Sequence, residues 1–329
     1  MLPVKIAGLG AYLPERIVTS TELERQLDIP SGWIEQVTGV RERRYVTHET
    51  ALSMGAAAAA QALDDAGLRP ADLDAIIGAS SAPHQTIPCT AALLQRELGA
   101  PDGASACFDI NATCLSFLFA LHTAAQFIHA GVYRRLLIVS SETAQHSRNP
   151  RERESAVLFG DAAAAAVITR AEPGEPSALC GARFATFSSG ADLARLPGGG
   201  SLHHPNDPAT TREQNMFHMD GPAIFKKATR LIAPFLDEFF TQVSWQRSAT
   251  DVVIPHQASR HGVEQLTRRL GFAPAQVYAN LAVRGNCIAA SIPLALAEAV
   301  AAGRVERGQR VALIGTGAGL TLGAAALVF

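Results

Sequence analysis

The chain has 329 residues, of which 48% are hydrophobic and 18% charged, and a formal net charge of −2 at pH 7. These values predict a large buried core in one or two domains, and they argue against a general binder of nucleic acid or membrane surfaces. Five cysteines are scattered without a CxxC spacing or a Cys/His cluster, so we expect no metal site and reduced thiols in a cytoplasmic protein.

The first stretch, "MLPVKIAGLGAYLPE", has Lys5 inside a short apolar run that ends in Gly and Pro. This pattern is typical of a first β-strand and turn, not of a signal peptide. The apolar run "AAAAAVI" near residue 165 is far shorter than the ~18 residues of a membrane span. We therefore expect no membrane partner.

Strands and helices alternate along the rest of the chain. Alanine-rich stretches at 51–67 and 292–303 predict helices that pack closely between layers. Short aliphatic runs that end in turn residues predict buried strands at 74–81, 134–142, 162–170, 250–256 and 310–317. This alternation favours an α/β layered fold.

The second half of the chain resembles the first. "LDAIIGASSAPHQ" parallels "TDVVIPHQASRHG", which aligns Asp251 with Asp74. "NATCLSFLFALHTAAQ" parallels "GNCIAASIPLALAEAV", which aligns Cys287 with Cys114. Two matches in the same order and at nearly the same offset indicate an internal duplication. We expect halves at 1–172 and 173–329, divided in the stretch "TRAEPGEPSA".

Cys114 lies in "DINATCLSF", after small polar residues and before an apolar run. On this stretch alone a buried structural cysteine is the simpler interpretation, because free cysteine is among the most buried residue types. The alternative is a nucleophile, since the start of a helix stabilises negative charge and lowers the pKa of a thiol. The duplication predicts that Cys114 and Cys287 face one another at equivalent helix starts.

Three other segments carry polar groups that we expect in a cleft between the two halves, together with Cys114. His256 follows the strand "DVVI", where open α/β sheets place functional groups, and a simple loop histidine is the alternative. Asn286 in "RGNC" is either a turn or cap residue or an inward-pointing amide. "GTGAGLTLG" lacks the ending of a phosphate loop, and its alternative role is to present backbone N–H donors to a reacting group.

Together these features resemble the β-ketoacyl-(acyl-carrier-protein) synthase III family of the thiolase superfamily. The resemblance runs from "AGLGAYLPERIVT" and "WIEQVTGVRERR" through "ATCLSF", "FGDAAAAAV", "PHQAS" and "RGNCIAAS" to the terminal glycine loop. It implies a thiolase-like duplicated α/β fold, layered α-β-α-β-α with two mixed sheets. It also implies a homodimeric acyltransferase that needs no cofactor beyond the coenzyme A of its thioester substrate.

By this resemblance, Cys114 takes the acyl group from acyl-CoA, and His256 and Asn286 bind the thioester carbonyl of malonyl-acyl carrier protein (malonyl-ACP). Decarboxylation gives an enolate whose oxygen needs preorganised donors, which these two side chains supply. The carbanion attacks acyl-Cys114, and the backbone N–H groups of Cys114 and Ala318 hold the oxyanion. The implied products are 3-oxoacyl-ACP, CO2 and CoA.

The resemblance also implies binding residues. Trp33 and Arg153 match the pair that stacks on the adenine of coenzyme A, although Trp33 alone can be a core aromatic. Phe225 matches a wall of the tunnel. The acyl pocket is implied at Ile87 (from the partner subunit), Leu115 and Thr316, and the carrier-protein docking face at Lys226, Arg260, Arg268 and Arg269. Taken alone, these basic residues are ordinary surface charge.

Several residues depart from the family pattern. They are Val37 and Glu154 near the coenzyme A nucleotide, Ser259 and His261 after the "PHQ" motif, Ile87 at the acyl pocket, and Thr316, Ala318 and Leu322 in the glycine loop. Ile87 stands where the family has a phenylalanine. The loss of aromatic groups predicts that the protein accepts an acyl group longer than acetyl.

Other functions fit parts of this pattern. A ketosynthase or acyltransferase of specialised metabolism, using a longer or unusual acyl group, would employ the same Cys, His and Asn. A Cys–His–Asn thioester hydrolase is disfavoured by the missing "CGSCW"-type context and by the duplication. A non-catalytic protein that binds acyl carriers is disfavoured because the set of three residues is intact.

Overall fold

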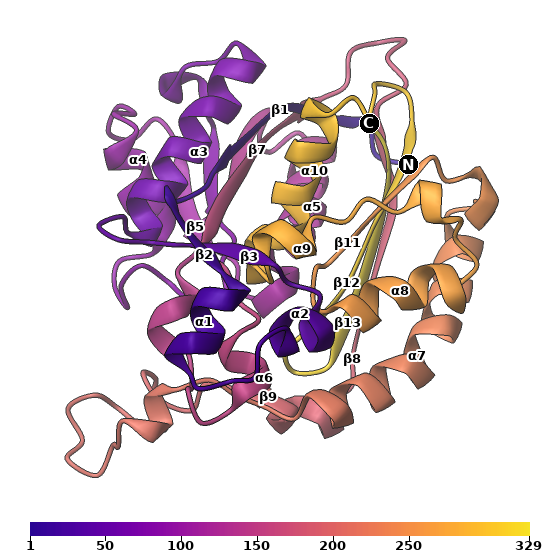
Figure 1. The fold of residues 1–329 in the computed structure, drawn as a ribbon. Coiled ribbons are helices and arrows are strands. Elements are labelled where there is room, and N and C mark those ends of the chain that lie inside the picture. Colours follow the sequence, from indigo (N-terminus) through magenta and orange to yellow (C-terminus); the bar gives the residue numbers. More distant parts are fainter.

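Two mixed β-sheets stack face to face with helices between them and on both outer faces (Figure 1). The computed structural model describes residues 1–329 apart from the side chain of Leu266. The strands of the first sheet, in spatial order, are β1 (Val4–Tyr12), β7 (Ala162–Arg170), β6 (Arg135–Glu142), β4 (Ala75–Gly78) and β5 (Ala106–Asp109). Those of the second are β8 (Ala178–Thr186), β13 (Thr321–Val328), β12 (Arg310–Gly317) and β11 (Val252–Pro255).

The second sheet repeats the topology of the first apart from β5, which has no counterpart. In the first, β7 runs antiparallel to both β1 and β6, and β4 is parallel to β6. In the second, β13 runs antiparallel to both β8 and β12, and β11 is parallel to β12. The duplicated fold inferred from the sequence is therefore present. The predicted boundary at 172/173 falls in the connection between β7 and β8.

The register of the parallel pairs fixes which residues correspond. Ala75 pairs with Leu136 in the first sheet, and Val252 pairs with Val311 in the second, so β12 corresponds to β6 with Val311 matched to Leu136. Asp74 and Asp251 also correspond, because each carboxylate accepts the backbone N–H that opens the neighbouring strand. The Arg135 N–H donates to Asp74 at 2.8 Å and the Arg310 N–H to Asp251 at 2.7 Å.

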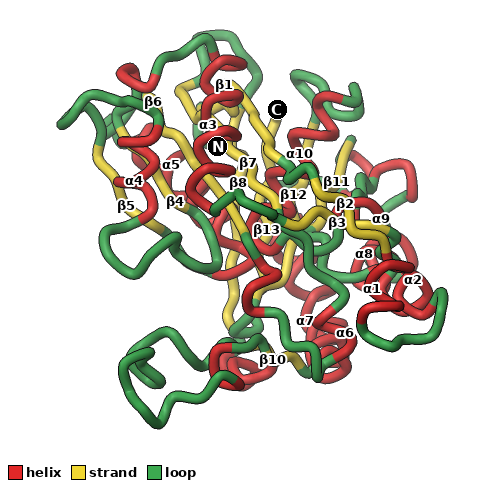
Figure 2. Tube along the Cα trace, turned by 60° about the vertical axis from the view of Figure 1, so that its left-hand side comes forward, coloured by secondary structure: helices red, strands yellow, loops and turns green.

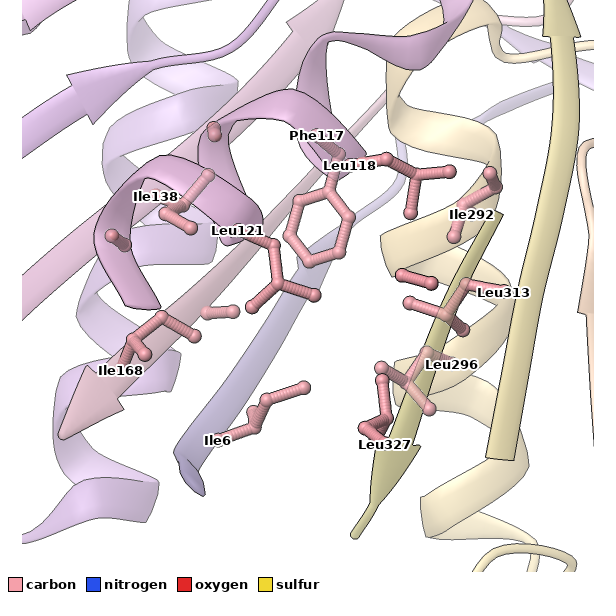
Figure 3. Close-up of a cluster of buried hydrophobic side chains, with 14 of the residues drawn as sticks. Ile6, Phe117, Leu118, Leu121, Ile138, Ile168, Ile292, Leu296, Leu313 and Leu327 are labelled. Atoms are coloured by element: carbon pink, nitrogen blue, oxygen red, sulfur yellow. The ribbon is translucent and has the colours of Figure 1, made fainter. Parts of the chain in front are cut away.

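The middle layer contains α5 (Ser116–His129) and α10 (Ser291–Ala301), one from each half. Their apolar side chains meet between the sheets, as Phe117 and Leu121 of α5 do with Ile292 and Leu296 of α10 (Figure 3). Small residues such as Ala124, Ala295 and Ala299 let the layers approach closely. Both helices begin at the same end of the sheets, which sets the position of the site.

The outer layers complete the fold. The helices α3 (Ala51–Ala66) and α4 (Thr90–Glu97) cover the first sheet, and α7 (Gly221–Gln242) and α8 (Arg260–Arg268) lie on the side of the second (Figure 1). The shorter elements are β2 (Arg16–Thr19), α1 (Ser20–Gln26), α2 (Trp33–Thr38), β3 (Glu42–Tyr45), α6 (Arg153–Ala156), β9 (Ala194–Arg195), β10 (His218–Met219) and α9 (Leu281–Arg284). The segment between β9 and β10 projects from the body of the molecule (Figure 2).

Among the described residues, no helix is both long enough and apolar enough to cross a membrane.

Candidate active site

Cys114 lies in the 3₁₀ turn Thr113–Leu115, immediately before α5 begins at Ser116. The Asn111 Oδ1 accepts the Thr113 N–H at 2.9 Å, and the Ser116 hydroxyl donates to the Thr113 carbonyl at 2.7 Å. Thr113 has a φ of 52°, an unfavourable conformation for a β-branched residue. These bonds hold the turn so that Cys114 precedes the first helical residue.

The second half builds the same turn around Asn286. Its Oδ1 accepts the Ile288 N–H at 2.9 Å, Ile288 has a φ of 50°, and α10 begins at Ser291. Asn286 therefore corresponds to Asn111, and Ala289 to Cys114, at the same offset along the chain that relates β12 to β6. The expected match between Cys287 and Cys114 is wrong, because the residue equivalent to Cys114 is Ala289, two positions after Cys287.

Cys287 does not face Cys114 across the cleft. Its side chain is 1% exposed, and its Sγ donates to the Arg284 carbonyl at 3.4 Å. Cys287 is therefore a buried structural cysteine beside Asn286, the role that the local sequence also allowed for Cys114.

The glycine-rich segment 315–323 forms the hairpin of β12 and β13, not a phosphate loop. A Cβ on Gly315 would lie 2.7 Å from Leu115 Cδ2 and 3.0 Å from His256 Cβ, and one on Gly317 would lie 2.9 Å from Thr113 Oγ1. These three contacts leave no room for a side chain, so glycine at both positions lets β12 pass against the Cys114 turn. The backbone N–H of Ala318 then lies near enough to the Cys114 sulfur to lower the pKa of the thiol.

A cavity of about 1120 Å³ joins the groups that the sequence singled out. Cys114, His256 and Asn286 all line it, together with Thr316 and Ala318. One end opens between α2, α7 and α8, where Val37, Phe225 and His261 line it, and it also reaches residues 81–84 and Glu142. A thiol, an imidazole and a carboxamide from both halves therefore share one cavity.

The Cys114 thiol is protonated at neutral pH, contrary to the expectation from its helix start. Burial is the main cause that raises the pKa of Cys114 to about 12; the Glu142 carboxylate acts in the same direction, whereas the N–H groups of Ala318 and Cys114 act in the opposite one. The loss of solvation outweighs the helix start, because the sulfur lies inside the protein and α5 begins two residues later. The thiol must lose its proton as the reaction proceeds.

His256 directly follows β11, and its N–H donates to the Ile314 carbonyl at 2.7 Å. Burial lowers the pKa of His256 to about 4, so the imidazole is neutral and carries one N–H and one basic nitrogen. Its side chain is 6% exposed, and its Nδ1 has no hydrogen-bond partner among the described groups.

Asn286 is held by its oxygen. Oδ1 accepts the Ile288 N–H at 2.9 Å and the Ser291 hydroxyl at 3.5 Å, and the main chain of Asn286 bonds to Leu158 and Gly160. None of the hydrogen bonds within the described part of the chain uses Nδ2. The amide NH2 is therefore the group that remains to donate to a ligand in the cavity.

The remaining predicted residues lie around this centre. Phe225 and Thr316 line the cavity, Trp33 is half-buried at the start of α2, and Arg153 is exposed on α6. Leu115 differs from its expected place at the acyl pocket: it is fully buried behind the site, because Gly315 and Gly323 let it pack against the second sheet. Ile87 is 82% exposed on this single chain.

The basic residues of the expected docking face lie on α7, on α8 or directly after it, and both helices also contribute residues to the cavity. Lys226 follows Phe225 on α7, and Arg260 packs its side chain against Gly39 at the end of α2. Arg268 and Arg269 are exposed at the far end of α8, and Arg268 pairs with Glu264 at 3.4 Å.

Sequence reasoning missed Glu142, Ser81 and His84, which also line the cavity. Glu142 ends the strand "LLIVSSE" and is 3% exposed. A charged residue at the carboxyl end of a buried strand was the available signal. Across the described residues, no group of three or more His, Cys, Asp or Glu side chains is arranged to hold a metal ion.

Comparison with known proteins shows which family this chain resembles. Residues 108–187 match the family described as 3-oxoacyl-[acyl-carrier-protein (ACP)] synthase III, and residues 240–329 match its C-terminal domain. The beta-ketoacyl-[acyl-carrier-protein] synthase III of Desulfitobacterium hafniense is 37% identical over 99% of this chain and 97% of its own.

Solved structures agree with the sequence matches. The 3-oxoacyl-[acyl-carrier-protein] synthase III of Aquifex aeolicus is 35% identical with a TM-score of 0.89, over 99% of this chain and 100% of that one. The priming beta-ketosynthase of the R1128 polyketide pathway is 29% identical with a TM-score of 0.90, over 99% of this chain and 96% of that one.

Proposed function

The chain belongs to the 3-oxoacyl-[acyl-carrier-protein] synthase III family, and from that premise we propose that it condenses an acyl group from acyl-CoA with malonyl-ACP. The products are 3-oxoacyl-ACP, CO2 and CoA. The observation that supports this function best is the single cavity in which Cys114, His256 and Asn286 meet. No step of this reaction requires a metal or an organic cofactor.

In the first step, the Cys114 sulfur attacks the carbonyl carbon of the acyl-CoA thioester. The backbone N–H groups of Cys114 and Ala318 both favour negative charge at this place, so they are the donors for the tetrahedral oxyanion. The thiol proton passes to the departing CoA sulfur. The neutral imidazole of His256 is the base in the cavity that can carry it.

In the second step, malonyl-ACP loses CO2 and leaves an enolate. The Asn286 Nδ2 and a His256 N–H donate to the enolate oxygen, and one such donor is typically worth about 3–4 kcal/mol of transition-state stabilisation. The enolate carbon attacks acyl-Cys114, a C–C bond forms and the C–S bond breaks. The Cys114 thiolate then takes up one proton, which restores the starting thiol.

The acyl donor is longer than acetyl. The cavity that Cys114 lines also reaches residues 81–84, and its volume is about 1120 Å³. Ile87 and Thr316 offer less bulk than aromatic side chains would. Coenzyme A enters at the end lined by Val37 and Phe225, beside Trp33 and Arg153, and the carrier protein docks on Lys226, Arg260, Arg268 and Arg269.

A second copy of the chain completes the site. The edge strand β5 (Ala106–Asp109) has one neighbour in its sheet and is half-buried, and an unpaired strand edge is a template for another chain. Ile87 and Val132 are exposed at 82% and 57%. We expect a homodimer by light scattering, with Ile87 of each chain covering the acyl end of the other's cavity. A stable monomer would contradict this expectation.

A ketosynthase or acyltransferase of specialised metabolism is the second candidate function, favoured by the likeness to the R1128 priming enzyme. It would use the same steps with an unusual acyl group, or transfer that group to oxygen or nitrogen without decarboxylation.

One assay tests these proposals together. The protein is incubated with acyl-CoA donors of increasing chain length and malonyl-ACP, and 3-oxoacyl-ACP, CO2 and free acid are measured. We expect equal amounts of 3-oxoacyl-ACP and CO2, with an optimum beyond acetyl. A sharp optimum at acetyl-CoA would contradict the chain-length proposal, acyl transfer without CO2 would favour an acyltransferase, and free acid alone would indicate a hydrolase.

A further inference from the structure

The duplication matches Glu142 of the first half to a glycine, Gly317, in the second half. Glu142 ends β6 six residues after Leu136, and Gly317 ends β12 six residues after Val311, which corresponds to Leu136. Glu142 and Gly317 are therefore equivalent positions. Each lies at the end of a central strand, beside the start of a middle-layer helix.

The two helix starts are occupied differently. At the start of α5 the strand position is Gly317, which has no side chain, and the N–H groups of Cys114 and Ala318 lie near enough to the sulfur to lower the pKa of the thiol. At the start of α10 the backbone N–H of Ala289, the counterpart of Cys114, lies near enough to the Glu142 carboxylate to lower its pKa. The turn at Cys114 lines the cavity, whereas its counterpart in the second half lies beside a carboxylate of the first half.

Glu142 is also bonded to the loop that lines the cavity next to it. Its two carboxylate oxygens accept the Ser81 N–H and the Ser81 hydroxyl, each at 2.6 Å. Ser81 in turn accepts from Asn111 Nδ2 through its carbonyl at 2.9 Å. A single carboxylate thus links the Asn286 segment, the loop at 81–84 and the turn of Cys114.

We propose that Glu142 is a positioning residue for the condensation step: its carboxylate lies beside the turn of the second half and holds the Asn286 segment at the cavity. This inference rests on the proposed function. In this proposal the decarboxylating condensation depends on the Asn286 segment that Glu142 holds in place. Acyl loading depends on the turn at Cys114.

The charge of Glu142 has a second consequence. Besides burial, this carboxylate holds the pKa of the Cys114 thiol above its usual range. Burial, with a smaller contribution from repulsion by Asp161, raises the pKa of Glu142 to about 7, so this carboxylate is charged at pH 8. Removing the charge of Glu142 therefore favours the Cys114 thiolate. Shortening the Glu142 side chain instead disturbs the Asn286 segment.

Two variants separate these effects. Glu142→Gln keeps the shape and removes the charge, and Glu142→Asp keeps the charge and shortens the side chain by one methylene. The exposed Glu306→Gln serves as a matched control far from the cavity. Alkylation of Cys114 is measured from pH 7 to 9, and acyl loading and condensation are measured as separate half-reactions.

We expect Glu142→Gln to be alkylated at least ~3-fold faster at pH 8, because one pKa unit corresponds to about tenfold in thiolate below the pKa. Glu142→Asp should be alkylated like the parent protein. Both variants should keep loading within about 3-fold and lose about 10- to 100-fold in condensation, since small displacements of a donor carry costs of this order.

Hydrogen exchange at residues 286–291 supplies a readout that needs no substrate. We expect faster exchange of the Ala289 amide in both variants and no change in Glu306→Gln. Unchanged exchange together with an unchanged ratio of condensation to loading would overturn the proposal. If the parent protein makes no 3-oxoacyl-ACP, the proposed function fails, and alkylation and exchange still decide the role of Glu142. If Glu142→Asp does not fold, Glu142→Gln alone decides it.

Discussion

The turns at 111–116 and 286–291 have one backbone and two chemistries. Both begin with an asparagine whose oxygen accepts the N–H two residues on at 2.9 Å, and both lead into a middle-layer helix at a serine. The first presents Cys114, and the second presents the amide of Asn286. The backbone geometry therefore supplies the position, and the side chain placed there determines the reaction.

The largest difference between the halves should appear when each cysteine is removed. Cys114→Ala deletes the acyl acceptor, and we expect loading to fall by about 10⁴-fold or more, as for other nucleophile deletions. Cys287→Ala removes a buried sulfur outside the cavity, and loading should stay within about 3-fold at a cost of about 1–2 kcal/mol in stability. Mass spectrometry of the acyl-enzyme measures loading. Equal losses in both variants would remove the distinction between the turns.

A second prediction concerns Asn286. Asn286→Ala removes the free Nδ2 donor, and we expect condensation to fall by about 10²–10³-fold, the loss seen when one donor to a developing oxyanion is deleted. Loading should change little, because the oxyanion of that step is held by Cys114 and Ala318. Single-turnover measurements of the two half-reactions check this. A variant in which loading falls as far as condensation would show that the two turns do not divide the reaction.

A third prediction concerns Gly317, which leaves the space beside the Cys114 turn free of a side chain. In Gly317→Ala the new Cβ would lie 2.9 Å from Thr113 Oγ1. We expect a cost of about 1–3 kcal/mol in stability from overpacking, with slower loading. Gly200→Ala is the matched control, since a Cβ there meets no atom within 4 Å. Thermal unfolding of both variants checks the difference. Equal melting temperatures would contradict the close approach of β12 to the turn.

The smallest predicted effect is a pH dependence of stability that comes from His256. Its folded pKa is about 4, below the value of about 6.5 for an unfolded histidine, so the folded protein binds fewer protons between these values. Stability from this group is present above pH 6.5 and is lost as the pH falls towards 4. From pH 7 to 5 we expect a loss of about 1–2 kcal/mol.

His256→Asn should lack this loss. Because Glu142 and Asp161, whose pKa values are raised by burial, titrate in both proteins, their contributions cancel in the comparison. Denaturant unfolding at pH 7 and pH 5 supplies the four free energies. A difference between the proteins that does not change with pH would show that the imidazole is not buried in the neutral form.

The strands, the duplication and the three chemical groups could be predicted from the sequence because each has a local signal. Aliphatic runs mark the strands, as at Leu136–Val139, and Asp74 and Asp251 mark matched strand starts. The match of Cys287 to Cys114 failed because residue identity was compared, whereas the register is set by backbone hydrogen bonds of Asn111 and Asn286.

The electrostatics of the site could not be predicted locally. The pKa of Cys114 depends on how deeply the sulfur is buried and on Glu142, which belongs to a later strand and not to the Cys114 turn. Neither quantity has a signature in "NATCLS". Leu115 was misplaced for the same reason, because only the glycines of β12 and β13 show that it packs behind the site.

The fate of a preformed acyl-Cys114 tests the account most directly. The protein is loaded from acyl-CoA, freed of CoA, and mixed with malonyl-ACP that carries an isotopic label in its carboxyl group. The account predicts that each acyl group leaving Cys114 gives one labelled CO2 and one 3-oxoacyl-ACP. An acyl group attached to another residue, or released as free acid without CO2, would contradict it.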